Sequence, residues 1–305
     1  MFGPAVVCYL FLGGLSGGLC VVTAVSGLSV PGCQLRKGPV PEQRRLIAVA
    51  LVACSGGFVL SSLLLLGDVG NVSAIEHLFL SSNPSYLVLG AWSLAAGIVL
   101  SLALAILWRA PSAAWSVSLA RGLLVAECLI GVVVVLYTGL FLAGMFAVPL
   151  WDTAWLVALF AASSASCALA AFAALTNAIG LSAAFAPWLR RIVQADVIAI
   201  VAELACSAGF LFAAFRFEAA SSAAPAACAS AFELMAGDLA FAWWGGFFFI
   251  GMIVPLVLEV LILRGRRSLP PYSLQALAPA LCAFAGSLAL RYCVVMAGMH
   301  PAVGF

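Results

Sequence analysis

Four side chains that can exchange protons or hydrogen bonds lie near the ends of long apolar segments: Tyr9, Asp68, Tyr137 and Asp152. A tyrosine hydroxyl can donate a hydrogen bond to a carbonyl oxygen, and a carboxylate can accept a released proton. Together with an apolar cleft, such a set is typical of a site that binds a ring and moves protons to or from it. The simpler interpretation is that the tyrosines belong to interfacial belts and the carboxylates solvate loop ends.

Three further ionisable residues, Glu127, Glu203 and Arg291, fall inside apolar segments. A charge at the centre of a membrane span costs about 2.5–3.5 kcal/mol on insertion scales, so such residues tend to be paired or functional. We predict either a structural ion pair between Glu203 and Arg291 or a proton path that includes Glu127 and this pair. Asp196 and Glu259 lie close enough to segment ends for their side chains to reach the membrane interface.

The ten cysteines and two histidines do not indicate a metal centre in this chain. No Cys-x-x-Cys spacing occurs, whereas cluster or zinc ligation needs grouped thiolates. His77 and His300 both lie near segment ends, and a bis-histidine haem needs two imidazoles that face each other inside a bundle. We therefore expect no haem, no metal and no redox centre in this chain.

The elements that must position these residues are membrane spans. The 305 residues are 66% hydrophobic and 8% charged, with a mean hydropathy of +1.22, which excludes a water-soluble globular chain. The net charge of +2 gives no indication of nucleic-acid binding. Eight segments are long and apolar enough to cross a bilayer, and no soluble domain of ordinary size fits beside them. They are 5–27, 46–67, 86–108, 119–143, 151–176, 192–215, 239–263 and 272–298.

Basic residues gather in alternate loops, and this pattern predicts the orientation of the spans. Lys and Arg in short loops stay on the cytoplasmic side. Both termini are therefore expected on the outer side of the cytoplasmic membrane. Of the thirteen basic residues, eleven fall on one side: Arg36, Lys37, Arg44, Arg45, Arg109, Arg121, Arg190, Arg191, Arg264, Arg266 and Arg267.

The predicted fold is an all-α integral membrane protein whose eight transmembrane helices form two four-helix bundles. Residues 1–145 form the first bundle, which contains the candidate site, and residues 146–305 form the second. Two outer loops, 68–85 and 217–238, are longer than a simple turn and could cover a site or meet a partner.

Four stretches, taken together and in order, resemble the NrfD/PsrC family, the membrane subunits of polysulfide-reductase-type complexes. By themselves, the Gly13/Gly17 and Gly14/Gly18 pairs in the first stretch indicate only close helix packing. The resemblance covers residues 9–175, and beyond them only the hydropathy pattern agrees. The stretches are Tyr9 to Gly18, Leu66-Gly67-Asp68-Val69-Gly70, Asn83-Pro84-Ser85 with Leu89-Gly90-Ala91-Trp92, and Tyr137-Thr138-Gly139 with Pro149-Leu150-Trp151-Asp152.

Two departures from the family pattern occur. Asn71-Val72 stands where the family often has Arg-Pro, and Val6 and Tyr9 stand where some relatives have the two ends of an Asn-x-x-His motif. The second departure leaves Tyr9 as the substitute candidate for the hydrogen-bonding partner of a quinone carbonyl.

The resemblance implies a membrane anchor of the polysulfide reductase or DMSO reductase type within a molybdopterin oxidoreductase. It implies electron exchange between menaquinol, or a related quinol, and a docked four-cluster iron–sulfur subunit. This subunit and a molybdopterin catalytic subunit would sit on the outer face. Carried over by motif, Tyr137 and Asp68 are the catalytic candidates. The quinone-binding candidates are Tyr9, Tyr137, Asp68, His77, Trp151 and Asp152.

Two other functions stay open. A secondary transporter or an ion-conducting protein would explain Glu127, Glu203 and Arg291 inside spans, although no matched pair of Gly/Pro-interrupted spans supports it. A purely structural anchor that has lost its quinone site would explain Val6.

Overall fold

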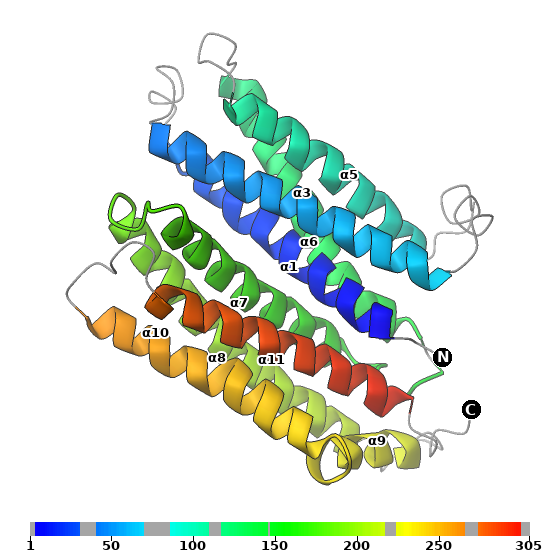
Figure 1. Cartoon of the computed structure of the whole chain (residues 1–305). Helices are drawn as coiled ribbons and strands as arrows, with labels where there is room; N and C mark the ends of the chain where they lie inside the picture. Colours follow the sequence, from blue (N-terminus) through cyan, green and yellow to red (C-terminus); the bar gives the residue numbers. More distant parts are fainter. Residues whose placement is uncertain are drawn as a thin grey trace.

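The computed structural model describes residues 4–30, 41–69, 86–109, 117–145, 147–216, 224–265 and 274–299. Regular structure in this part of the chain is helical, and the long helices run side by side (Figure 1). The π-helix η3 continues directly into α10, so the two form one long segment. The helices are α1 Pro4–Leu28, α3 Pro41–Val69, α5 Tyr86–Arg109, α6 Val117–Ala143, α7 Ala154–Ala178, α8 Ala186–Arg216, α9 Ala224–Ala236, η3 Ala242–Ile253, α10 Val254–Arg264 and α11 Leu274–Gly298.

Eight segments in the described part of the chain are long and apolar enough to cross a membrane, with η3 and α10 taken as one. The predicted multi-pass membrane protein is thus confirmed. Two helices, α3 and α8, begin more than a turn before the predicted spans at 46 and 192, because the helical backbone continues through polar residues that hydropathy excludes. The predicted loop 217–238 contains a further helix, α9, whose alanines favour helix formation.

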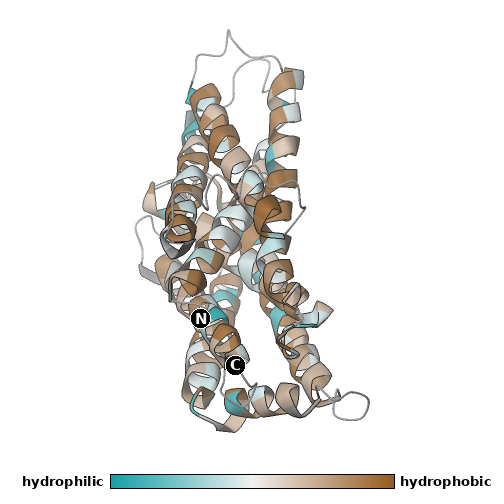
Figure 2. Cartoon of the chain, turned by 90° about the vertical axis from the view of Figure 1, so that its right-hand side faces the viewer, coloured by the Kyte–Doolittle hydropathy of each residue, from teal (hydrophilic) through white to brown (hydrophobic). Residues whose placement is uncertain are grey.

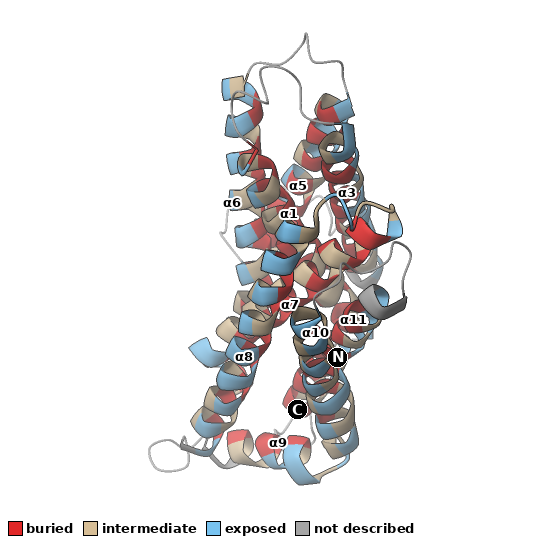
Figure 3. Cartoon of the chain, turned by 90° about the vertical axis from the view of Figure 1, so that its left-hand side faces the viewer, coloured by how far each residue is buried: buried red, intermediate tan, exposed pale blue. Residues whose placement is uncertain are grey.

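Apolar side chains cover the outside of the molecule as well as its interior. Hydrophobic residues occur along all the long helices in Figure 2, and exposed residues line their outer sides in Figure 3. Val99, Ile106, Leu129 and Ile198 are 62–70% exposed. Such an exterior suits lipid tails, which are as apolar as these side chains.

The helix α1 lies between the other helices. It contacts α3 and α6 as well as α7 and α11 (Figure 1). A Cβ atom on Gly17 would lie 2.9 Å from the backbone oxygen of Gly131 in α6, and one on Gly18 would lie 2.8 Å from that of Ser164 in α7. The glycine run therefore serves two close helix contacts on different sides of α1. The division into two four-helix bundles stays a prediction, since α7 contacts both α1 and α6.

Two arginines bind the carboxyl ends of neighbouring helices. Arg44 of α3 donates from Nε to the carbonyl oxygen of Trp108 (3.1 Å) and from Nη2 to that of Arg109 (3.0 Å). Both carbonyls belong to the last turn of α5. Arg190 Nη2 donates to the carbonyl oxygen of Leu263 near the end of α10 (2.8 Å). A cation at this position satisfies free carbonyl groups and complements the helix dipole. The first turn of α1 and the last turn of α11 lie at the opposite end of the molecule (Figure 1).

Candidate functional site

Tyr9 of α1 and Tyr137 of α6 meet inside the helix bundle. Their side chains are 2% and 1% exposed and interact with each other. Phe141, one turn beyond Tyr137, lies beside both rings, with 6.1 Å between ring centres in each pair. The fold therefore brings together two of the predicted quinone-binding residues from spans that are far apart in the sequence.

Two small residues on neighbouring helices lie against the tyrosines. A Cβ atom on Gly90 of α5 would overlap the phenol ring of Tyr137. Ser61 of α3 donates from Oγ to the carbonyl oxygen of Tyr9 (3.0 Å). The helices α1, α3, α5 and α6 thus all contribute to the surroundings of the tyrosines. Gly90 belongs to a stretch that carries the family resemblance, whereas no sequence signal singles out Ser61.

The hydroxyl of Tyr137 has unused hydrogen-bonding capacity. Its oxygen is buried and, apart from its neighbour Tyr9, has no hydrogen-bond partner of ordinary geometry among the described residues. Burying a hydroxyl without a partner costs about 1–3 kcal/mol. A carbonyl oxygen brought next to Tyr137 would remove this cost by accepting the hydrogen bond, which is the chemistry that a quinone oxygen offers.

Asp68 lies in the last turn of α3, at the end of the bundle where α1 begins. It follows Ser61 by seven residues, which is about 10 Å along the helix. The side chain of Asp68 and the whole of His77 lie outside the described residues. Their predicted part in the site stays a prediction.

Trp151 and Asp152 occupy the turns before α7. Asp152 is exposed. Trp151 is buried, and its indole Nε1 donates to the carbonyl oxygen of Val294 in α11 (3.0 Å). Its ring also packs against Gly298, where a Cβ atom would overlap it. These contacts of Trp151 are with α11, while Tyr9 and Tyr137 belong to α1 and α6.

Arg291 of α11 is completely buried and is held by serines. Its Nη1 donates to both the backbone oxygen (3.1 Å) and the hydroxyl of Ser287, and its Nη2 donates to Ser164 Oγ of α7 (2.8 Å). The guanidinium carbon lies 5.1 Å from the ring centre of Phe160 and 5.9 Å from that of Phe11. Hydrogen bonds and aromatic faces thus replace water around this cation.

Glu203 and Arg291, the predicted ion pair, influence each other electrostatically across an intervening serine rather than by direct contact. Among the described residues, the two side chains make no direct salt bridge. The carboxyl group of Glu203 in α8 interacts with the hydroxyl of Ser163 in α7, and Ser163 Oγ donates to Ser287 Oγ (3.0 Å). Helix α7 packs against both α8 and α11 and supplies the serine between the two charges.

Asp196 and Glu259 do not reach the membrane interface as predicted. They are 1% and 2% exposed, their carboxyl groups interact with each other, and Asp196 also interacts with Ser166 of α7. The predicted span began at 192, but α8 begins at Ala186, so more than a turn of additional helix lies beyond Asp196. Two carboxyl groups in contact can hold one proton between them.

The side chain of Glu127 in α6 is completely buried, and its contacts differ from those of Glu203. Its Oε1 accepts a hydrogen bond from Ser101 Oγ of α5 (2.5 Å), and Cys20 of α1 interacts with both side chains. Its Oε2 has no hydrogen-bond partner among the described residues. These contacts connect Glu127 with α1 and α5, whereas Glu203 contacts α7. A single proton path through Glu127, Glu203 and Arg291 therefore stays a prediction.

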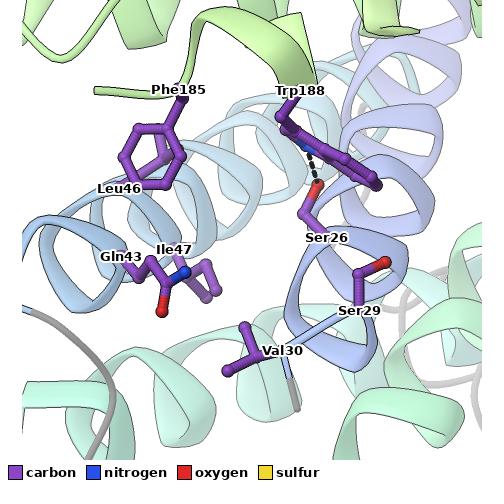
Figure 4. Close-up of a pocket in the computed structure, with 8 residues that line it drawn as sticks. All are labelled: Ser26, Ser29, Val30, Gln43, Leu46, Ile47, Phe185 and Trp188. Atoms are coloured by element: carbon purple, nitrogen blue, oxygen red, sulfur yellow. Dashed lines mark hydrogen bonds between the residues drawn. The ribbon is translucent and has the colours of Figure 1, made fainter. Parts of the chain in front are cut away.

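A small pocket lies at the end of the bundle opposite to the tyrosines. Ser26, Gln43 and Trp188 are among the residues that line it, and Trp188 Nε1 donates to Ser26 Oγ (3.3 Å; Figure 4). Its volume of about 160 Å³ is below the usual range for an organic ligand. Within the described residues, no three His, Cys, Asp or Glu side chains gather as a metal site requires.

The comparison with known protein families agrees with the resemblance seen in the sequence. The model of the NrfD-type family described as polysulfide reductase matches residues 4–305. The match is essentially the whole chain, so it extends through the second half, where the sequence offered no motif. No curated protein matches the chain.

Proposed function

Because the chain belongs to the NrfD-type polysulfide reductase family, we propose that it is the quinone-reactive membrane subunit of a multi-subunit molybdopterin oxidoreductase. The chain exchanges electrons between the quinone pool and a docked iron–sulfur subunit. The observation that carries this proposal is the buried hydroxyl of Tyr137, which lies beside Tyr9 and has unused hydrogen-bonding capacity. This donor is available to a quinone carbonyl inside a membrane-spanning bundle.

Each proposed residue has a definite role. A bound quinol, menaquinol or a related one, supplies electrons and protons when it is oxidised. Tyr137 would donate a hydrogen bond to a ring oxygen, which is a hydroxyl in the quinol and a carbonyl in the quinone, and Tyr9 packs beside Tyr137. Asp68 at the end of α3 accepts a proton and releases it to the outer side. Trp151 and Asp152 are further candidates at this end of the bundle, and His77, outside the described residues, is a candidate from the sequence.

The distribution of basic residues supports an orientation for this site. Arg44 and Arg190 belong to the predicted cytoplasmic loops and bind helix ends that lie opposite to the tyrosines. The tyrosines and both termini then lie toward the outer side of the cytoplasmic membrane. A four-cluster iron–sulfur subunit and a molybdopterin subunit dock on this face, so that electrons have a short path from the quinone.

Affinity purification of the tagged chain in mild detergent, followed by mass spectrometry, tests the proposed assembly. We expect a four-cluster iron–sulfur protein and a molybdopterin protein to remain bound. Recovery of the chain alone, from membranes where it is abundant and intact, would contradict the proposal. Within the purified complex, unchanged quinol-driven turnover in both Asp68→Asn and Tyr137→Phe would show that the proposed site is wrong.

A second candidate function is proton or ion conduction through α7, α8 and α11, and the serine-bridged link between Glu203 and Arg291 favours it. A serine hydroxyl donates one hydrogen bond and can accept two, so Ser163 can turn its proton toward either neighbour. The carboxyl pair of Asp196 and Glu259 continues this polar region, because Asp196 lies seven residues from Glu203, about 10 Å along α8.

Proton flux into liposomes that contain the purified protein tests this second candidate. We expect Glu203→Gln to abolish the flux and Glu42→Gln, at an exposed position in the first turn of α3, to leave it unchanged. Equal fluxes in the two variants and the unsubstituted protein would exclude conduction through Glu203.

A further inference from the structure

A larger hollow lies among α1, α6, α7 and α8, away from the tyrosines. Its volume is about 590 Å³, and its wall is almost entirely apolar, with many valines and alanines. Val25, Val132 and Leu136 line it and are 40–45% exposed, so the hollow opens to the lipid-facing surface. On α7 it extends from Ala161 to Leu169, which is about 12 Å along the helix. Its length and apolar wall suit a hydrocarbon chain.

One residue that lines this hollow carries a charge. Arg191 of α8 is exposed, and no hydrogen bond or ion pair joins it to another described residue. The neighbouring Arg190, by contrast, donates to the carbonyl oxygen of Leu263. A guanidinium group can bind phosphate oxygens through two parallel hydrogen bonds. Arg191 is therefore a free cation at the edge of an apolar hollow.

Trp188 fixes the depth of this charged edge. It lies one turn before Arg191 on α8 and also lines the hollow. Its indole Nε1 donates to Ser26 Oγ of α1, so the ring is held in place (Figure 4). Tryptophan is enriched at the level of the lipid headgroups. This enrichment indicates that the edge with Trp188 and Arg191 faces the headgroups and that the valine-lined part faces the hydrocarbon layer.

We propose that this hollow binds one acyl chain of an anionic phospholipid and that Arg191 binds the phosphate of its headgroup. The charge of Arg191 decides between the possible occupants. A quinone tail would fill the apolar part, but an uncharged quinone would leave Arg191 without a partner. A zwitterionic phospholipid carries a positive group that weakens the attraction. The lipid site is independent of the redox function proposed above.

Native mass spectrometry of the protein purified in mild detergent tests the lipid site, with phosphatidylglycerol and phosphatidylcholine added in equal amounts. We expect preferential retention of phosphatidylglycerol. Arg191→Gln should lower this retention about fivefold, the effect of one basic residue near an anionic headgroup. Arg190→Gln is the matched control and should leave it unchanged, because Arg190 does not line the hollow.

A second pair of variants tests the apolar part. Ala165→Phe fills the hollow and should lower the retention of both lipids, whereas Val133→Phe, on an exposed part of α6 outside the hollow, should not. Full retention in Arg191→Gln, or equal losses in the two arginine variants, would overturn the proposal. Bound quinone that Ala165→Phe displaces, while phosphatidylglycerol stays, would also overturn it by assigning the hollow to a quinone tail.

Discussion

Tyr137→Phe should lower quinol-driven turnover without lowering stability. The substitution removes one hydroxyl and keeps the ring, which packs against Gly90 and Phe141. Apart from its neighbour Tyr9, the Tyr137 oxygen has no hydrogen-bond partner of ordinary geometry among the described residues, so its removal deletes a buried polar group whose hydrogen-bonding capacity is mostly unused. We expect the free energy of unfolding to stay unchanged or to rise by about 1 kcal/mol. Such a rise would shift the Tm in detergent upward by about 2 °C.

Turnover should fall in Tyr137→Phe, although stability should not. A hydrogen bond from Tyr137 to a ring oxygen, a hydroxyl in the quinol and a carbonyl in the quinone, contributes about 1 kcal/mol, so its loss should lower kcat/KM for the quinol about fivefold. The assay is quinol-driven reduction of the terminal substrate by the purified complex, measured beside thermal unfolding of the same sample. Removal of a structural hydroxyl would lower stability, whereas removal of a hydroxyl that binds the quinone would lower only turnover.

Tyr292→Phe is the matched control, because Tyr292 lies on α11 and is 41% exposed toward lipid. We expect it to change neither quantity. If Tyr137→Phe lost more than about 1 kcal/mol of stability while turnover stayed normal, the hydroxyl would have a structural partner and the reasoning would be refuted.

Three further substitutions test the packing and the buried charge. Gly14→Ala should lower the free energy of unfolding by about 1–3 kcal/mol, because its Cβ would lie 2.8 Å from Nη2 of Arg291 and even closer to Ser164 Oγ. Gly56→Ala is the control, since a Cβ atom there would meet nothing within 4 Å, and thermal unfolding should show no loss. Arg291→Gln should lower stability by about 3–5 kcal/mol, since a buried acid loses its nearby cation, and a normal yield of folded protein would contradict this. Arg44→Ala should lower the free energy of unfolding by about 0.3–1 kcal/mol, because two carbonyl groups at the end of α5 lose their donor. Faster amide hydrogen exchange at that end of α5, and not elsewhere, would detect the change.

The membrane-spanning helices were predictable because hydrocarbon requires long apolar stretches. Their ends were less predictable, because hydropathy falls at the first charged residue while backbone hydrogen bonding continues. Helix α8 is the clearest case: its start at Ala186 covers Asp196, which the predicted span placed near its edge. The burial of Asp196 comes from its contacts with Glu259 and Ser166, which a hydropathy pattern does not reveal.

The tyrosine site was partly predictable because its motifs fix residue types at particular places on two spans. Tyr9 and Tyr137 meet as expected, but Ser61 and Ser163 were not singled out, since serine is common in membrane helices and only helix rotation decides where it points. The serine between Glu203 and Arg291 was missed for a related reason. Sequence places Glu203 and Arg291 in the sixth and eighth spans but does not reveal that α7 lies between them.

The glycines of α1 that contact α6 and α7 also constrain how many residues separate them from Tyr9. Gly17 approaches α6 and Gly18 approaches α7, and successive residues of an α-helix differ by about 100° in direction. The rotation of α1 is therefore fixed from two sides, and Tyr9 keeps its direction only while its distance in residues from these glycines is unchanged. Inserting one residue between Tyr9 and the glycine run would turn the phenol away from Tyr137 and leave both helix contacts intact. For α1, the number of residues between tyrosine and glycine is as important as their identity.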